Sequence, residues 1–248
     1  MIVFLYGRDS YRLKQNLDKI IAEYRKKNSG MGFSILDFGP DAPAGARQQL
    51  EKLTELIKTV SFFDEKRLIV LKNAFLAGGK ITDLITDWEL GLDKQRILVF
   101  VENLEGKELS KKDKKLFNLL SARPNIAKSF KPLEGKRLEN WAREEVESLG
   151  GQIEPGALRK LVSYAANLPA KDKLSDPTAI WRLEQEINKL VNYKSAAGKN
   201  SSVKNVTINV SDVELLVGLN INLNIFEVTD AIANKSKYRA AAALYNHL

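Results

Sequence analysis

The chain has 248 residues, of which 44% are hydrophobic and 28% charged, and this composition predicts one or two globular domains rather than a disordered protein. It contains no cysteine, which excludes a disulfide framework, a cysteine zinc site and a thiol nucleophile. The formal net charge is +8, and ten Lys or Arg against four Asp or Glu fall between residues 103 and 137. This local excess fits either an anionic partner, such as nucleic acid or an acidic protein, or a solvated lysine-rich helix face.

The N-terminal residues 2–6 are all apolar or aromatic and are followed by Gly7. This pattern predicts a first strand and not a signal peptide, because it has no basic lead and no small-residue cleavage site. No apolar run approaches the roughly 18 residues that span a bilayer. We therefore expect a cytoplasmic protein without a membrane partner.

Strands and helices are expected to alternate through the first half of the chain. Helical spacing predicts helices at about 10–27, 44–58, 80–88 and 110–120, the first capped by Asp9 or Ser10 and the last by Ser110. Apolar runs predict five strands, at 2–6, 33–38, 68–71, 96–101 and 126–130. Apolar strands separated by helices indicate an α/β fold in which helices cover both faces of a parallel sheet.

After Pro132 the strands are expected to stop, apart from a short extended piece at 206–210. Helices are predicted at about 138–149, 155–168, 178–193 and 212–218, with two more helical segments after residue 225. Residues 194–205 are polar and rich in glycine and serine, which favours a loop. Because Leu248 falls within a helical pattern without a capping residue, we expect the chain to end inside a further domain.

A phosphate-binding loop is absent from the sequence. Such a loop needs G-x-x-x-x-G-K-[ST], whereas the first strand is followed by Gly7-Arg8-Asp9-Ser10, in which Asp9 would repel phosphate. The Gly-Lys pairs at 79–80, 106–107, 135–136 and 198–199 lack both the earlier glycine and the following hydroxyl. The third strand ends in Leu71-Lys72-Asn73 instead of acidic residues that could hold magnesium.

Other catalytic arrangements are also missing. The single histidine, His247, excludes a histidine triad or a histidine metal cluster. The neighbouring glutamates at 144–145 and at 184 and 186 have the spacing of a helix surface. We therefore predict no catalytic residue, no metal site and no cofactor.

The stretch from Lys58 to Asn73 places two adjacent phenylalanines, Phe62 and Phe63, directly before a β-branched strand. A turn on such a short connection is held rigidly. Aromatic side chains in that position are either part of the domain's own core or anchors for a pocket on a partner.

Three segments carry a resemblance to a known family. Residues 4–11 (Phe-Leu-Tyr-Gly-Arg-Asp-Ser-Tyr), residues 61–71 (Ser-Phe-Phe-Asp-Glu-Lys-Arg-Leu-Ile-Val-Leu) and residues 224–233 resemble the delta subunit of bacterial DNA polymerase III. The resemblance extends over the whole chain and is weakest in the middle. It implies an AAA+-type α/β domain at 1–133, a small helical lid at 134–218 and the start of a helical collar at 219–248.

The resemblance also implies a function. Members of this family do not hydrolyse ATP; they bind the sliding clamp and open one of its interfaces within a clamp loader, as part of the polymerase holoenzyme. The family's clamp contact is a hydrophobic pair before the third strand, which corresponds here to Phe62 and Phe63, flanked by Val60 and Ser61. Lys58 stands where clamp-binding peptides commonly carry glutamine, and a lysine cannot accept the hydrogen bonds of an amide.

Two alternative functions remain open on the sequence. One is an ATPase or nucleotide kinase with a degenerate phosphate loop. The other is a module that binds DNA directly through the basic region, whose candidate contacts are Lys107, Lys111, Lys112, Lys114 and Lys115. Within a clamp loader, these lysines could instead face a neighbouring subunit, so that DNA is met through the assembled complex.

Overall fold

The computed structural model describes residues 1–28, 32–42, 44–59, 66–167, 179–197, 206–217, 232–234 and 236–238. The chain divides into two compact units, one formed by Met1–Glu134 with Ala170–Ile180, and the other by Gly135–Pro169 with Trp181–Leu248. Each unit is described separately below.

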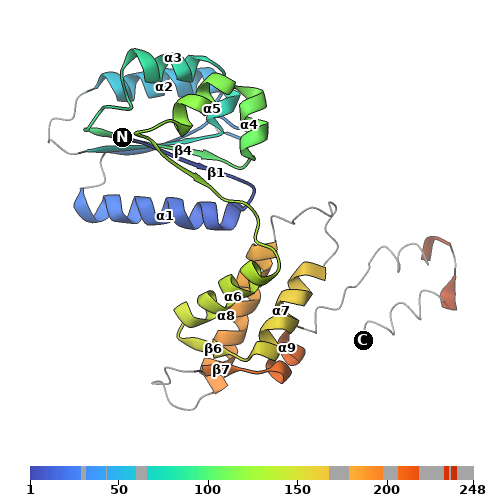
Figure 1. Cartoon of the computed structure of the whole chain (residues 1–248). Coiled ribbons are helices and arrows are strands. Elements are labelled where there is room, and N and C mark those ends of the chain that lie inside the picture. Colours follow the sequence, from blue (N-terminus) through green and yellow to red (C-terminus); the bar gives the residue numbers. More distant parts are fainter. Residues whose placement is uncertain are drawn as a thin grey trace. The chain divides into compact units, whose positions relative to one another are not determined.

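The first unit is built on a five-stranded parallel sheet with the strand order β2-β3-β4-β1-β5 (Figure 1). The strands are β1 (Ile2–Tyr6), β2 (Phe33–Asp37), β3 (Arg67–Lys72), β4 (Arg96–Glu102) and β5 (Ile126–Ser129). They match the five strands predicted from apolar runs, and every pairing is parallel. The predicted α/β class is therefore confirmed.

Helices cover both faces of this sheet, as the alternating pattern predicts. Helix α1 (Ser10–Lys27) lies on one face, and α2, α3, α4 and α5 lie on the other (Figure 1). Their bounds are α2 Ala46–Lys58, α3 Lys80–Asp87, α4 Gly106–Lys112 and α5 Lys114–Ser121, and a short 3-10 helix, η1, covers Ala74–Leu76. In the described part of the chain, no helix is long and apolar enough to cross a membrane.

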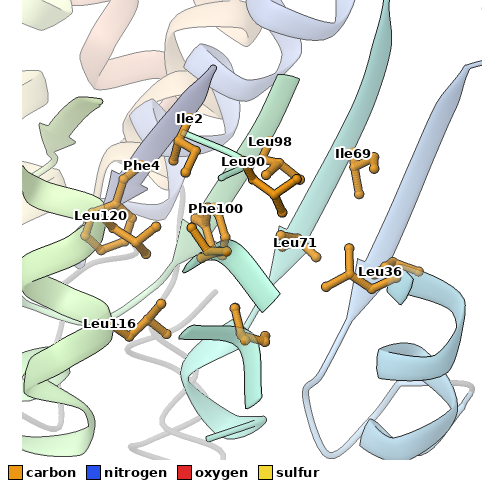
Figure 2. Close-up of a cluster of buried hydrophobic side chains, with 14 of the residues drawn as sticks. Ile2, Phe4, Leu36, Ile69, Leu71, Leu90, Leu98, Phe100, Leu116 and Leu120 are labelled. Atoms are coloured by element: carbon orange, nitrogen blue, oxygen red, sulfur yellow. The ribbon is translucent and has the colours of Figure 1, made fainter. Parts of the chain in front are cut away.

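Two hydrophobic cores form because alternate side chains of each strand point to opposite faces. On the face covered by α2–α5, Phe4, Leu98 and Phe100 pack against Leu116 and Leu120 of α5 (Figure 2). On the face covered by α1, strand residues 3, 5, 68, 70, 99 and 101 pack against Leu13, Leu17 and Tyr24. Burial on both faces explains why the central strands are continuously apolar.

The lysine-rich region folds differently from the prediction. Residues 106–121 form two helices, and Ser110 lies inside the first of them instead of capping a single helix. The break occurs at Asp113, whose Oδ1 accepts a hydrogen bond from the backbone N–H of Leu116 at 2.9 Å and so caps α5. An aspartate that caps the following turn competes with continuation of the helix.

The second unit contains helices with a small sheet between them. Its elements are α6 (Lys136–Ser148), β6 (Gly151–Ile153), α7 (Pro155–Asn167), α8 (Ala179–Ala197), β7 (Val206–Ile208) and α9 (Val210–Leu216). The expectation that strands stop after Pro132 is wrong, because β6 pairs with β7 in parallel. The predicted loop at 194–205 is wrong over its first residues, since α8 continues to Ala197, and the rest of it lies outside the described residues. Most of the helical pattern predicted after residue 225 lies outside the described residues.

Candidate functional site

The predicted clamp contacts Val60, Ser61, Phe62 and Phe63 lie outside the described residues, but the structure describes both ends of the segment that carries them. Helix α2 ends at Lys58, and β3 begins at Arg67. Strand β3 is a central strand, paired with β2 on one side and with β4 on the other. Both ends of the segment are therefore fixed to the core of the first unit.

Two arginines satisfy the exposed carbonyl groups at the C-terminal end of α2. Arg67 Nη1 donates to the carbonyl of Leu56 at 3.1 Å, and Arg96 Nη2 donates to the carbonyl of Ile57 at 2.5 Å. The last four carbonyls of a helix lack partners within the helix, and cationic side chains there also complement its dipole. These two arginines were not singled out from the sequence. In the sequence, Arg96 begins a predicted strand and Arg67 directly precedes one, and in the structure the two residues are paired in adjacent strands.

An aspartate holds Arg96 in this position. Asp93 Oδ2 lies 2.5 Å from Arg96 Nη1, and both side chains are largely buried. Burial acts to raise the pKa of the Asp93 carboxyl, but hydrogen bonds from Arg96 and from the backbone of Gln95 outweigh it, so that this pKa is lowered. The ionised carboxylate therefore orients the guanidinium that caps α2.

The loop after β1 occupies the edge of the sheet where α/β proteins commonly bind phosphates. Gly7 has a φ of +137°, and a Cβ on it would lie 2.1 Å from the carbonyl oxygen of Phe130. The backbone N–H of Asp9 donates to the same carbonyl at 3.1 Å. Main chain leaving β5 therefore packs directly against this loop, and position 7 accepts no residue larger than glycine.

A buried carboxylate occupies the N-terminus of α1. Asp9 is 1% exposed and caps the helix by accepting a hydrogen bond from the backbone N–H of Arg12 at 3.0 Å. Its second oxygen lies 2.5 Å from Arg12 Nε, and Arg12 Nη2 donates to the carbonyl of Lys131 at 2.5 Å. A helix N-terminus attracts anions, and here the anion is part of the chain. That Asp9 opposes phosphate binding stays a prediction.

Polar residues at the ends of β2, β3 and β4 are hydrogen-bonded within the chain. Asn73 Nδ2 donates to Asp37 Oδ1 at 2.7 Å, and Glu102 Oε1 accepts a hydrogen bond from the backbone N–H of Phe75 at 3.2 Å. Burial raises the pKa of the Glu102 carboxyl from 4.5 to about 7, despite hydrogen bonds from the backbone of Phe75 and Ala74. No group of three or more metal-binding side chains occurs among the described residues.

The five candidate lysines are all exposed at the surface of α4 and α5. Lys107, Lys111 and Lys112 belong to α4, whereas Lys114 and Lys115 begin α5 after the break at Asp113. Within the part of the chain that the structure describes, none of the five forms an ion pair with a carboxylate. They are available to an anionic partner, and their role stays a prediction.

The model of the family described as DNA polymerase III, delta subunit, matches residues 4–129. No curated protein matches the sequence. Among solved structures, the chain is similar to the Bacillus subtilis DNA clamp loader delta protein YqeN, with 19% identity and a TM-score of 0.56 over 99% of this chain. It is also similar to a variant of Thermotoga maritima RuvB, with 14% identity and a TM-score of 0.53.

These structural similarities establish the fold, which is of the AAA+ type in its sheet domain. The RuvB similarity extends over 93% of this chain and 67% of the RuvB chain. The similarity to the clamp loader delta protein extends over 66% of that protein, so the chain spans slightly less than two thirds of its length.

Proposed function

Because the chain belongs to the family of the DNA polymerase III delta subunit, we propose that it is a clamp-loader subunit that binds the sliding clamp and opens one of its interfaces. Phe62 and Phe63 are the proposed anchors, with Val60 and Ser61 beside them. The observation that supports this most directly is the anchoring of both ends of their segment, by Arg67 and Arg96 at the end of α2 and by the central strand β3.

Anchoring of this kind matters for the energetics of clamp binding. Burying one phenylalanine is worth about 1.5–3 kcal/mol, whereas a micromolar contact needs roughly 8 kcal/mol. Two phenylalanines can supply a large share of this only if little conformational entropy is lost on binding. A ring opens when its opener binds the open form better than the closed form, and anchors fixed to a core can make that distinction. Lys58 is exposed and is the last residue of α2. It stands where clamp-binding peptides usually carry glutamine, so a hydrogen-bond acceptor is replaced by a donor.

The proposed subunit does not hydrolyse ATP and needs no cofactor. Its phosphate-binding edge carries the Asp9 carboxylate on the N-terminus of α1 and main chain from Phe130 against Gly7. These contacts favour a subunit that does not bind nucleotide over the alternative, an ATPase with a degenerate phosphate loop. A titration with Mg-ATP tests this point, and tight magnesium-dependent binding would favour the ATPase.

The proposed partners are the sliding clamp and the other clamp-loader subunits, with DNA reached through the assembled complex. The exposed, unpaired lysines of α4 and α5 support an anionic partner for that surface. A helical lid at 134–218 and the start of a collar at 219–248 belong to the same proposal.

The decisive experiment is the double variant Phe62→Ala/Phe63→Ala, tested for binding to the sliding clamp of the same organism. The matched control is Leu76→Ala/Leu92→Ala, which removes two exposed leucines of the same unit. We expect the phenylalanine variant to lose clamp binding while its circular dichroism and melting temperature stay unchanged, and the control to bind normally. Retained binding by a folded phenylalanine variant would contradict the proposal. Unfolding of that variant would assign the pair to the core instead.

Clamp opening needs its own measurement. Two fluorophores placed across one interface of the clamp report separation by a fall in energy transfer. We expect the unmodified chain to lower the transfer and the phenylalanine variant to leave it unchanged. Binding without any fall in transfer would support a clamp-binding subunit that does not open the ring.

A further inference from the structure

A groove of about 810 Å³ lies between α1 and the strands on its face of the sheet. It is at the amino edge of the sheet, opposite the loop after β1, because its lining includes Met1, Lys66 and Ile126 near the starts of β1, β3 and β5. Among the described residues, α1 is the helix of the first unit that covers this face, whereas α2, α3, α4 and α5 cover the other (Figure 1). One helix cannot cover five strands, so β5 is left exposed.

The groove has an elongated shape. Residues at helical spacing in α1, from Asn16 to Lys27, and the C-cap Asn28 form one side, a length of about 18 Å at the rise of an α-helix. Ile126 and Lys128 of β5, which point to the same face of the sheet, form part of the other side. A length of about 18 Å accommodates five or six residues of extended peptide, at about 3.3 Å per residue, and exceeds what a small metabolite fills.

The floor of the groove is aliphatic. Val3, Leu5, Ile20 and Ile97 contribute to it, and Ile126 leaves 45% of its surface exposed. The aromatic residue in the lining, Tyr24, is buried and donates its hydroxyl hydrogen to the carbonyl of Lys66. Single-stranded nucleic acid is typically bound through exposed aromatic rings on which bases stack. An aliphatic floor without such rings instead favours leucine-like side chains.

The rim of the groove is basic. Four of its lining residues are exposed lysines, Lys19, Lys27, Lys66 and Lys128, and one is an acid, Glu23. Glu23 pairs with Lys26, a lysine outside the lining, at 2.6 Å. Within the described chain, none of the four rim lysines is paired with a carboxylate. Charge complementarity at a rim of this kind selects an acidic ligand.

We propose that this groove binds an extended segment of a partner protein in which acidic residues alternate with leucine-like residues. The apolar side chains of that segment fill the aliphatic floor, and its carboxylates meet the four rim lysines. The open edge of β5 lies beside the groove and offers backbone hydrogen bonds to such a segment. None of the lining residues is one of the proposed clamp anchors, and the inference rests on the lining alone.

A phage-displayed library of random peptides, selected on the full chain, tests the proposal. The test variant is Lys19→Glu/Lys27→Glu, and the matched control is Lys52→Glu/Lys80→Glu, which makes the same charge change at two exposed lysines of α2 and α3 outside the groove. We expect selected peptides to combine Asp or Glu with Leu, Ile or Met. Their affinity should fall about tenfold or more in the test variant and much less in the control.

Two further measurements complete the test. Ile126→Ser should weaken the selected peptides with no change in melting temperature, and raising the salt from about 0.1 M to 0.5 M should weaken them as well. An oligothymidylate that competes with the peptides and loses binding in the test variant would assign the groove to nucleic acid and overturn the proposal. Selection of neutral or basic peptides, absence of any enrichment, or equal affinity for the test and control variants would also overturn it.

Discussion

The guanidinium Nη2 of Arg96 donates a hydrogen bond to the carbonyl oxygen of Ile57 at 2.5 Å. This contact joins the beginning of β4 to the last turn of α2, directly before the segment that carries Phe62 and Phe63. Its effect on stability and on clamp binding can therefore be measured by a single substitution.

Replacing Arg96 by Met should destabilise the chain by about 1–3 kcal/mol, because the Ile57 carbonyl and the buried Asp93 carboxylate both lose a partner. Urea unfolding measures this change. The control is Arg47→Met on α2, where the arginine side chain is 92% exposed and the expected change is below about 0.5 kcal/mol. Clamp affinity should fall in the Arg96 variant only. Equal stability of the two variants would show that the cap on α2 contributes nothing.

Replacing Asp9 by Ala should cost about 1–2 kcal/mol, because α1 loses its N-cap and Arg12 loses its carboxylate partner. Asp18→Ala, on the exposed side of the same helix, is the control and should change stability much less. The Asp9 variant should still fail to bind Mg-ATP in calorimetry, since the loop also lacks the second glycine and the lysine of a phosphate-binding motif. Gain of tight ATP binding would show that the carboxylate alone had prevented it.

The Glu102 carboxyl makes stability depend on pH in a defined direction. Its pKa in the folded chain is about 7 against an ordinary value of 4.5, so between these pH values the folded state binds more protons than the unfolded state. Stability from this group is therefore greatest below about pH 4.5 and falls until about pH 7. Glu102→Gln should remove this dependence and stabilise the chain at pH 8 by up to about 3 kcal/mol. Thermal unfolding at pH 5, 6, 7 and 8 measures it.

An exposed glutamate provides the comparison for Glu102. Glu55→Gln, on the surface of α2, should leave the slope of stability against pH unchanged between pH 5 and 8. If the Glu102 and Glu55 variants show the same slope as the unmodified chain, the buried carboxyl does not titrate in this range.

The lysines of α4 and α5 predict the salt dependence of any DNA binding by the isolated chain. Lys111→Ala/Lys115→Ala should reduce the slope of log affinity against log salt by about 2, if both contact phosphate. Lys52→Ala/Lys80→Ala, which changes the same charge at exposed positions elsewhere, should leave the slope nearly unchanged. Fluorescence anisotropy with a labelled duplex measures both. An unaltered slope in the first variant would indicate that these lysines contact a protein partner and not DNA.

Much of the first unit could be predicted because its signals are local. The strand at residues 2–6 has the bounds that its apolar run indicates, and Asp9 caps the following helix. The break at Asp113 was missed because amphipathic spacing continues across it, and one capping hydrogen bond decides the outcome. Strand β6 was missed because Gly151-Gln152-Ile153 is too short to show a period, and it forms only by pairing with β7.

The candidate site was predicted unevenly for a related reason. Phe62 and Phe63 were found through resemblance, and the five lysines through local charge. The contact of Arg96 with Ile57 joins residues 39 positions apart. The spacing of apolar residues along the sequence does not predict a contact between residues so far apart. The groove beside α1 likewise depends on how many helices cover one face, which is a property of the assembled fold.

The close approach of Gly7 to Phe130 has a consequence for protein engineering. Any motif grafted onto residues 7–13 has to keep glycine at its first position, because a Cβ at position 7 would lie 2.1 Å from the carbonyl oxygen of Phe130. A larger residue there would force the main chain that leaves β5 to move.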